Sequence, residues 1–247
     1  MATDEAILRA VARNQAHPTL RLYAWQPGCL SLGRGQTVRD VDRQAVGEAG
    51  YDLVRRPTGG RAILHIDELT YSVVAPESDP RVSGPVVESY RRLSTALVYA
   101  LELLGIEQVA ADERVENRNN EGAVCFEVPS DYEITADGKK LVGSAQMRAQ
   151  GVVLQHGTLP LRGDIARICP LLASRPDPAS VRARATTVEE TLSRAISWER
   201  AARALENGFA QMLNLQLEPA ELTGAERRAV GTMRSEKYGT ARWTAYV

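Results

Sequence analysis

Segments with the patterns of β-strands lie close together in the first two thirds of this 247-residue chain, without regular alternation with helices. Each is a short apolar or alternating run bounded by glycine, proline or polar residues, as is typical of strands. Because a parallel sheet needs a helix between successive strands, this arrangement favours an α+β fold, with a mixed or antiparallel sheet and flanking helices. The predicted strands are Leu20 to Trp25, Tyr51 to Arg55, Arg61 to Leu64, Leu69 to Val74, Tyr132 to Thr135, Lys140 to Gln146 and Gly151 to His156.

Helical periodicity appears early in the chain, in its middle, and throughout its last third. Apolar residues recur at helical spacing from Asp4 to Val11, from Val86 to Leu104 and from Ser197 to Leu213. Thr187 followed by Glu190 predicts the start of a further helix through a capping box. Because no repeat or long linker divides the chain, we expect residues 1–247 to form a single domain with a helical C-terminal part from about residue 164.

Charge and hydropathy patterns exclude several kinds of partner. The chain has 30 Lys and Arg against 31 Asp and Glu, so it lacks the basic excess that nucleic-acid and membrane-surface binding usually require. The most apolar stretch, Leu97 to Leu104, contains Glu102 and is too short to span a bilayer. The first residues have the pattern of an amphipathic helix rather than that of a signal peptide. We therefore expect a cytoplasmic protein that binds neither nucleic acid nor membranes.

Three cysteines, Cys29, Cys125 and Cys169, are too few and too scattered for a disulfide framework or a thiolate metal site, and we expect no metal. Cys125 follows a polar stretch from Asp112 to Glu121 and precedes a predicted strand. A cysteine in such a place can be accessible to a substrate. A small buried hydrophobic residue beside Phe126 is the alternative interpretation.

An arginine- and glycine-rich segment with the sequence RRPTGGRAILH, residues 55–65, joins two predicted strands. Gly59 and Gly60 allow the backbone to approach a ligand closely. Arg55, Arg56 and Arg61 supply cationic donors for a carbonyl, phosphate or adenylate group. A surface hairpin with solvated arginines is the alternative.

Lysine is rare in this chain, which has 27 arginines but only 3 lysines. A lysine kept against that bias indicates that an amine able to titrate is needed. Asp137-Gly138 predicts a hairpin turn, with Lys139 in the turn itself. Strict alternation in the following strand places Lys140 and Ser144 on one face, so we expect them to point into one space.

Five segments, RRPTGGRAILH, ELTYSV, CFEVPSDYEI, GKKLVGSAQ and VLQHGTLPL, together resemble the lipoate-protein ligase A-like branch of the biotin/lipoyl protein ligase superfamily. The similarity runs in order over nearly the whole chain. Lipoate-protein ligases typically have Ser-Gly-Gly-Gly after the paired arginines, whereas Thr58-Gly59-Gly60-Arg61 resembles the LipM-type octanoyltransferases. The chain departs from the family at His65-Ile66-Asp67, where relatives commonly have His-Asp.

The resemblance implies the biotin/lipoyl protein ligase catalytic-domain fold and a cofactor-free acyltransferase. Its substrates would be octanoyl-acyl carrier protein and a lysine of a lipoyl-carrier protein, either the glycine cleavage H protein or an E2 lipoyl domain. It assigns the nucleophilic thiol to Cys125 and the essential amine to Lys140. The substrate-binding residues that it implies are Arg55, Arg56, Thr58, Gly59, Gly60, Arg61, His65, Gly143, Ser144 and His156.

Two other functions fit the same residues. The first is an ATP-dependent lipoate or octanoate ligase that forms an acyl-adenylate, with Cys125 as a bystander. The second is a non-catalytic module that binds an acyl group or a carrier protein. For the transferase, we expect the octanoyl chain to occupy an apolar tunnel lined by side chains such as Val73, Val142 and Leu154.

Overall fold

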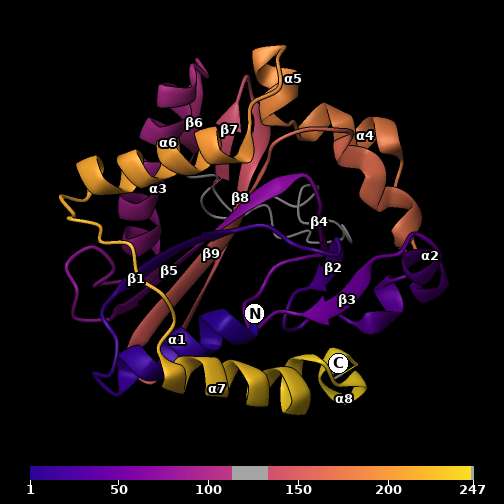
Figure 1. Ribbon diagram of the computed structural model, residues 1–247. Coiled ribbons are helices and arrows are strands. Elements are labelled where there is room, and N and C mark those ends of the chain that lie inside the picture. Colours follow the sequence, from indigo (N-terminus) through magenta and orange to yellow (C-terminus); the bar gives the residue numbers. More distant parts are fainter. Residues whose placement is uncertain (113–132, 246–247) are drawn as a thin grey trace.

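The structure, a computed structural model, describes residues 1–112 and 133–245, whose strands form two sheets (Figure 1). The larger sheet has the order β1-β5-β9-β8-β7-β6, and all its neighbouring strands are antiparallel. In the smaller sheet, of order β3-β2-β4, β2 is parallel to β3 and antiparallel to β4. The predicted α+β fold with a mixed and antiparallel sheet is confirmed. The strands are β1 (Thr19–Tyr23), β2 (Cys29–Leu32), β3 (Asp52–Arg55), β4 (Ile63–His65), β5 (Glu68–Pro76), β6 (Val109–Asp112), β7 (Glu133–Ala136), β8 (Lys139–Ala149) and β9 (Val152–Pro160).

Helices flank both sheets and make up most of the chain that follows β9. Two short 3-10 helices, η1 (Val38–Asp40) and η2 (Ile165–Leu171), and a π-helical turn, η3 (Arg234–Tyr238), accompany them. The α-helices are α1 (Ala2–Ala12), α2 (Arg43–Glu48), α3 (Val86–Leu104), α4 (Pro178–Arg184), α5 (Val188–Leu192), α6 (Trp198–Met212), α7 (Gly224–Met233) and α8 (Ala241–Thr244).

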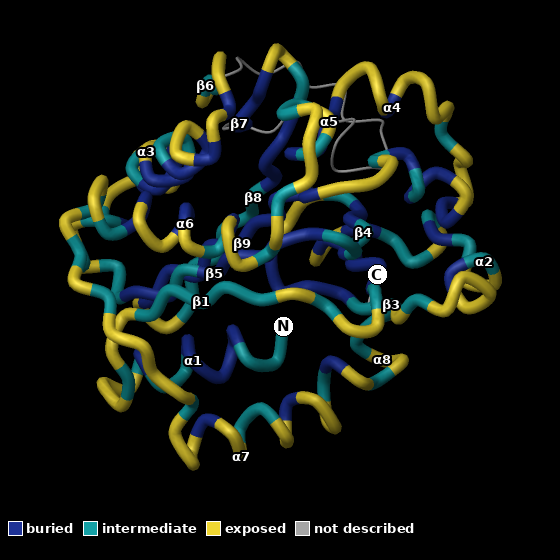
Figure 2. Tube along the Cα trace, turned by 45° about the horizontal axis from the view of Figure 1, so that its top comes forward, coloured by how far each residue is buried: buried dark blue, intermediate teal, exposed yellow. Residues whose placement is uncertain are grey.

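The main hydrophobic core lies between the larger sheet and the pair of helices α3 and α6 (Figure 2). It contains large side chains such as Leu93, Leu101 and Phe209, each of which contributes about 1.5–3 kcal/mol through burial. Gly208 allows the two helices to approach closely, because a Cβ there would lie 2.4 Å from the carbonyl oxygen of Ala96. The apolar residues that recur at helical spacing in α3 and α6 therefore form this part of the core.

A second layer covers the opposite face of the larger sheet. Helix α1 packs against β5 and β9 and is backed by α7, while the smaller sheet packs with η2 and α4. The segment between β3 and β4, which holds Gly59 and Gly60, thereby faces strands β5, β8 and β9. This juxtaposition of the two sheets builds the site described below.

The hairpin between β7 and β8 confirms one prediction and corrects another. Asp137 and Gly138 both have positive φ, 50° and 74°, as the predicted tight turn requires. However, Thr135 pairs with Lys140 while Ile134 pairs with Val142, so β8 contains one extra residue, a β-bulge. The prediction of strict alternation from Lys140 onward is wrong because the bulge interrupts it. Leu141 and Val142 consequently both lie in the main core.

Candidate active site

Arg55 lies at the end of β3 and joins the C-terminal helix α8 to the loop that follows β2. The guanidinium is buried, and Trp243 Nε1 in turn donates to the carbonyl oxygen of Arg55 at 2.8 Å. This is a structural role, which explains why so large a cation is found in the interior. The guanidinium donates at 2.5–3.3 Å to the carbonyl oxygens of Gly33, Arg34, Gln36, Trp243 and Thr244.

Arg56 is also buried, and it holds the glycine-containing loop in place. Its Nε and Nη2 donate to the carbonyl oxygen of Gly59 at 3.1 and 2.9 Å, and Nη2 donates to that of Arg61 at 2.7 Å. Its Nη1 donates to both oxygens of Ser31 at 3.1 Å. Gly60 has φ +93°, and a Cβ there would lie 2.8 Å from Arg56 Nη2, so only glycine fits this position.

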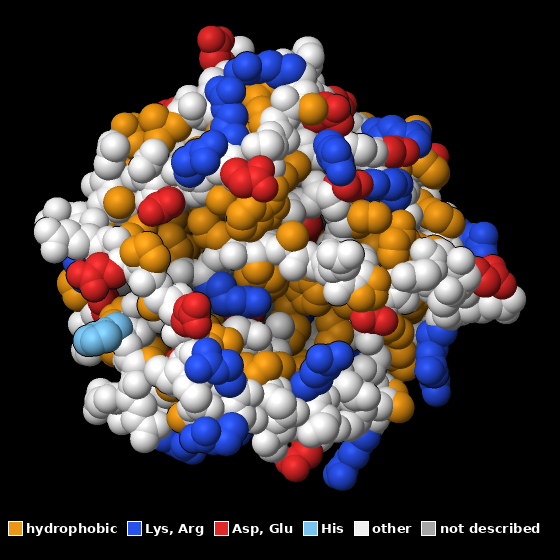
Figure 3. Space-filling model, viewed as in Figure 1, with side chains coloured by type: hydrophobic (Ala, Val, Ile, Leu, Met, Phe, Trp, Pro, Cys, Tyr) orange, Lys and Arg blue, Asp and Glu red, His pale blue; other side chains and the backbone are white. Residues whose placement is uncertain are grey.

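A cavity of about 200 Å³ lies between this loop and the larger sheet. The loop and β4 form one wall, and strands β5, β8 and β9 form the other. Figure 3 shows a hollow with apolar and basic side chains around it on this face of the molecule. The described residues that line the cavity are Met1, Arg56, Gly59, Gly60, Ile63, His65, Thr70, Tyr90, residues 143–146 and residues 156–158.

The cavity brings together most of the site residues that the sequence suggested. Arg56, Gly59, Gly60, His65, Gly143, Ser144 and His156 all line it. Arg55, Thr58, Arg61 and Lys140 are not among its described lining residues. Cys125 lies outside the described residues.

The apolar residues expected around an acyl chain lie elsewhere. Val142 and Leu154 are buried in separate hydrophobic clusters, and Val73 packs against the main core. The expectation for these three residues is wrong, because the bulge in β8 turns Val142 into the core and β9 presents Leu154 to α1. Met1, Ile63 and Tyr90 are the larger residues with apolar surface at the described cavity wall.

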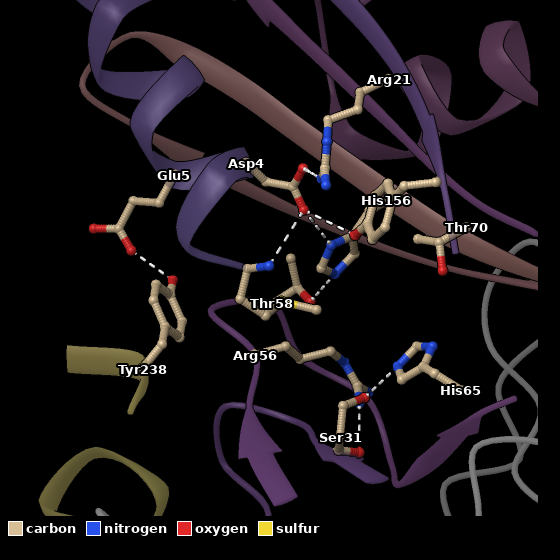
Figure 4. Close-up of polar contacts among 12 residues, drawn as sticks. Asp4, Glu5, Arg21, Ser31, Arg56, Thr58, His65, Thr70, His156 and Tyr238 are labelled. Carbon is tan, nitrogen blue, oxygen red and sulfur yellow. Dashed lines mark hydrogen bonds and ion pairs between the residues drawn. The ribbon is translucent and has the colours of Figure 1, made fainter. Parts of the chain in front are cut away.

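His156 connects the cavity to a buried carboxylate (Figure 4). Its Nε2 lies 2.6 Å from Thr58 Oγ1, and its Nδ1 lies 3.9 Å from Asp4 Oδ2, too far for a hydrogen bond. Burial lowers the pKa of His156, although Asp4 opposes the shift, so the ring is neutral near pH 7. Arg21 donates to Asp4 at 2.7 Å. The neutral ring of His156 therefore connects β9 to the glycine loop through its hydrogen bond with Thr58.

His65, on β4, lies in the opposite wall of the cavity and has two polar partners that were not predicted from the sequence. Its Nε2 lies 2.7 Å from Ser31 Oγ, and its Nδ1 lies 3.0 Å from Glu68 Oε1. The Trp25 ring stacks on the imidazole with centroids 4.4 Å apart. Ser31 stands 34 residues before His65, so no local sequence pattern connects them.

Ser144 is held at the cavity by a buried tyrosine. Its Oγ lies 2.7 Å from the hydroxyl of Tyr71, which accepts a hydrogen bond from Gln155 Nε2 at 3.0 Å. Burial raises the pKa of Tyr71 to about 12, so the phenol remains protonated and can donate to Ser144.

Lys140 lies buried at the start of β8 and forms an ion pair with Glu133 on β7. The Nζ of Lys140 is 2.7 Å from Oε1 of Glu133, and both side chains are at least nine-tenths buried. Glu133 was not among the site residues predicted from the sequence. Two buried charges at this distance stabilise each other, and removing one of them leaves the other in an unfavourable environment.

We predict that Gly157→Ala destabilises the protein by about 3 kcal/mol and distorts the cavity, because core overpacking has such costs. A Cβ there would lie 2.5 Å from Tyr71 Cε1 and 2.6 Å from the carbonyl oxygen of Gly143. Urea unfolding measures the effect. Gly35→Ala is the matched control, because a Cβ there meets nothing within 4 Å. Equal stability of the two variants would contradict the prediction.

The sequence of this chain matches a family of known proteins. The family model for the lipoyl protein ligase A/B catalytic domain matches residues 1–210. The chain belongs to this family. An octanoyltransferase LipM from Kyrpidia tusciae is 44% identical over 98% of this chain and 92% of its own length. The octanoyltransferase LipM from Staphylococcus aureus is 37% identical over the same shares of the two chains.

Solved structures of the lipoyl protein ligase family have the same fold. A lipoate-protein ligase A bound with ATP has 26% identity and a TM-score of 0.82, with 99% of this chain and 92% of that chain covered. A bi-partite lipoate protein ligase from Thermoplasma acidophilum, studied with its E2 lipoyl domain, has 24% identity and a TM-score of 0.78. The match covers 100% of this chain and 91% of that ligase.

Two features are absent from the described residues of this member of the lipoyl protein ligase family. In residues 1–112 and 133–245, no helix is long and apolar enough to cross a membrane. Within the same residues, no group of three or more His, Cys, Asp or Glu side chains is placed to hold a metal ion.

Proposed function

We propose that this chain transfers an octanoyl group from octanoyl-acyl carrier protein to a specific lysine of a lipoyl-carrier protein. The observation that carries the proposal is 37–44% identity, over 98% of the chain, to proteins named octanoyltransferase LipM. The solved ligase structures are less similar, at 26% identity or below. The acceptor is the glycine cleavage H protein or an E2 lipoyl domain.

In the first half-reaction, the thiolate of Cys125 attacks the thioester carbonyl of octanoyl-acyl carrier protein. A new thioester forms on Cys125, and the thiol of the carrier leaves. Exchange of a thiol with a thioester converts one thioester into another and is nearly thermoneutral, so ATP is not required. The ammonium of Lys140 favours the thiolate and gives its proton to the departing sulfur.

In the second half-reaction, the ε-amine of the acceptor lysine attacks the thioester on Cys125. The amide bond forms, the thiolate of Cys125 leaves, and the neutral amine of Lys140 takes the proton from the attacking nitrogen. Lys140 thereby returns to its ammonium form beside Glu133. Backbone N–H groups of Gly59, Gly60 and Gly143 are the candidate donors to the oxygen of the tetrahedral intermediate.

An ATP-dependent ligase is the second candidate, because a lipoate-protein ligase A bound with ATP has the same fold. In that reaction, octanoate and ATP would form an acyl-adenylate and release pyrophosphate. The chain departs from the ligase sequence at Arg61, which stands where ligases have glycine, and we expect its side chain to crowd a bound adenylate. Arg56, whose N–H groups bind Ser31, Gly59 and Arg61, is already engaged by the protein.

The deciding experiment incubates the protein with an apo lipoyl-carrier protein and either octanoyl-acyl carrier protein or free octanoate, each with and without ATP. We expect octanoylation of the acceptor from octanoyl-acyl carrier protein alone, with a rate that ATP does not change. Mass spectrometry of the acceptor measures the product. Acceptor modification only with octanoate and ATP, together with pyrophosphate release, would establish the ligase instead. No modification under any condition would indicate a binding module.

A further inference from the structure

A series of hydrogen bonds runs from Trp25, which follows β1, through strand β5 to the glycine loop at the cavity. It begins at Trp25, whose Nε1 donates to Thr70 Oγ1 at 2.9 Å. Thr70 Oγ1 donates to Glu68 Oε1, which also lies 3.0 Å from His65 Nδ1. Each of Glu68, Thr70 and His65 is less than 5% exposed. Buried polar groups that are fully bonded in this way fix one arrangement of the side chains.

The series of hydrogen bonds continues from His65 through Ser31 and Arg56 to the glycine loop (Figure 4). Ser31 Oγ lies 2.7 Å from His65 Nε2 and accepts a hydrogen bond from Arg56 Nη1 at 3.1 Å. The remaining N–H groups of Arg56 hold the carbonyl oxygens of Gly59 and Arg61. Arg56 therefore connects His65 and Ser31 to the loop at the cavity.

The chemistry of the end groups limits the directions of these hydrogen bonds. The indole of Trp25 and the guanidinium of Arg56 can only donate, and an ionised Glu68 can only accept. When its proton is on Nδ1, His65 donates to Glu68, and its Nε2 accepts the hydroxyl proton of Ser31. Ser31 in turn accepts from Arg56. Both nitrogens of His65 are therefore engaged by polar partners.

The spacing of Ser31, His65 and Glu68 resembles that of a hydrolase triad, but the site excludes that role. Ser31 is 0% exposed and is not among the described residues that line the cavity. A nucleophile must reach its substrate. The same geometry instead suits a group of residues that acts through Arg56.

The orientation of Arg56 sets the orientation of the loop amides. In a planar trans peptide, the N–H points opposite to the C=O of the same unit. Because Arg56 binds the carbonyl oxygen of Gly59, the N–H of Gly60 points away from the guanidinium. Gly59 and Gly60 both line the cavity, where an acyl group would be held.

We propose that Ser31, His65 and Glu68 are positioning residues that hold Arg56 so that the N–H of Gly60 meets the acyl oxygen in the transition state. The inference rests on the proposed acyl transfer and adds to it three residues that act on the reaction through Arg56. A donor aimed at the developing oxyanion contributes to kcat more than to substrate binding.

The test compares His65→Gln with His65→Leu in octanoyl transfer from octanoyl-acyl carrier protein. Neither side chain can act as a base, but the Gln amide oxygen can accept the Ser31 proton as Nε2 does. We expect His65→Gln to retain kcat within about tenfold of the unmodified enzyme, and His65→Leu to lose about 100-fold, since small misplacements of a site have such effects. KM for octanoyl-acyl carrier protein should remain within about threefold in both.

Two buried serines provide a second comparison. Ser31→Ala removes the hydroxyl that connects His65 to Arg56, and we expect the kcat of this variant to fall by about 10- to 100-fold. Ser72→Ala is the matched control, because Ser72 is 1% exposed and its Oγ has no hydrogen-bond partner among the described atoms. Its kcat should be unchanged.

Each result separates the inference from the proposed function. An unmodified enzyme that does not transfer octanoyl would refute the function itself. An active enzyme in which His65→Gln and His65→Leu are equally impaired, or in which only KM changes, would overturn the positioning role. If Ser31→Ala does not fold, thermal melting reveals this. The comparison of His65→Gln with His65→Leu then tests the positioning role alone.

Discussion

Cys125→Ala is expected to abolish octanoyl transfer and to prevent any covalent acyl-enzyme. The unmodified protein, mixed with octanoyl-acyl carrier protein alone, should gain one octanoyl group of about 126 Da as a thioester, because covalent catalysis divides the transfer into two steps. Hydroxylamine should remove this mass, since it cleaves thioesters. Intact-mass spectrometry before and after hydroxylamine measures both properties.

The other two cysteines of the chain are internal controls for this experiment. Cys29 and Cys169 are both buried, and burial, aided by Asp52, raises the pKa of Cys29 to about 12. A thiol with so high a pKa forms little thiolate near neutral pH and is a poor nucleophile. Cys29→Ala and Cys169→Ala should therefore still form the adduct. Normal transfer by Cys125→Ala in the presence of ATP, with no adduct on the unmodified enzyme, would refute the thioester mechanism.

The sequence predicted elements well where their ends carry strong signals. Helix α3 has the predicted bounds, Val86–Leu104, because Pro85 precedes it and Gly105 follows it with φ +92°. Strand β2 was missed because Cys29–Leu32 is buried on both faces and therefore shows no alternation. Strand β6, Val109–Asp112, was missed because its two alanines favour helix over strand.

Several residues predicted for the site line one cavity, but the directions of their side chains were not predicted. The Arg56–Arg61 segment lies at the cavity, as its glycines suggested, yet Arg55 and Arg56 direct their N–H groups to backbone carbonyls. Composition shows how many donors a segment has, whereas the fold decides which acceptors they meet. Ser31 reaches His65 only through the β2–β4 register, in which Cys29 pairs with His65 and Ser31 pairs with Ile63. Such a contact between strands leaves no local trace in the sequence.

Lys140→Arg is expected to reduce octanoyl transfer by about 100-fold or more, the scale of general acid–base catalysis. Lys140 Nζ lies 2.7 Å from Glu133 Oε1 in a buried pair, and a guanidinium is wider than an ammonium and does not release its proton. The rate at which a preformed octanoyl-enzyme discharges to an apo lipoyl-carrier protein measures the effect. Lys139→Arg should be nearly silent, because Lys139 pairs with Glu190 at the surface. Substantial activity of Lys140→Arg would show that only the positive charge matters.

Variants of the ion pair separate the catalytic role of Lys140 from its contribution to stability. Lys140→Met alone removes the ammonium from the buried carboxylate of Glu133, which we expect to cost about 3–5 kcal/mol of unfolding free energy. The double variant Lys140→Met with Glu133→Gln removes both charges, so most of that stability should return, as urea unfolding would show. Acyl transfer should remain lost in the double variant, because neither side chain can take the proton of the attacking amine. Recovery of transfer together with stability would mean that Lys140 supports only the fold.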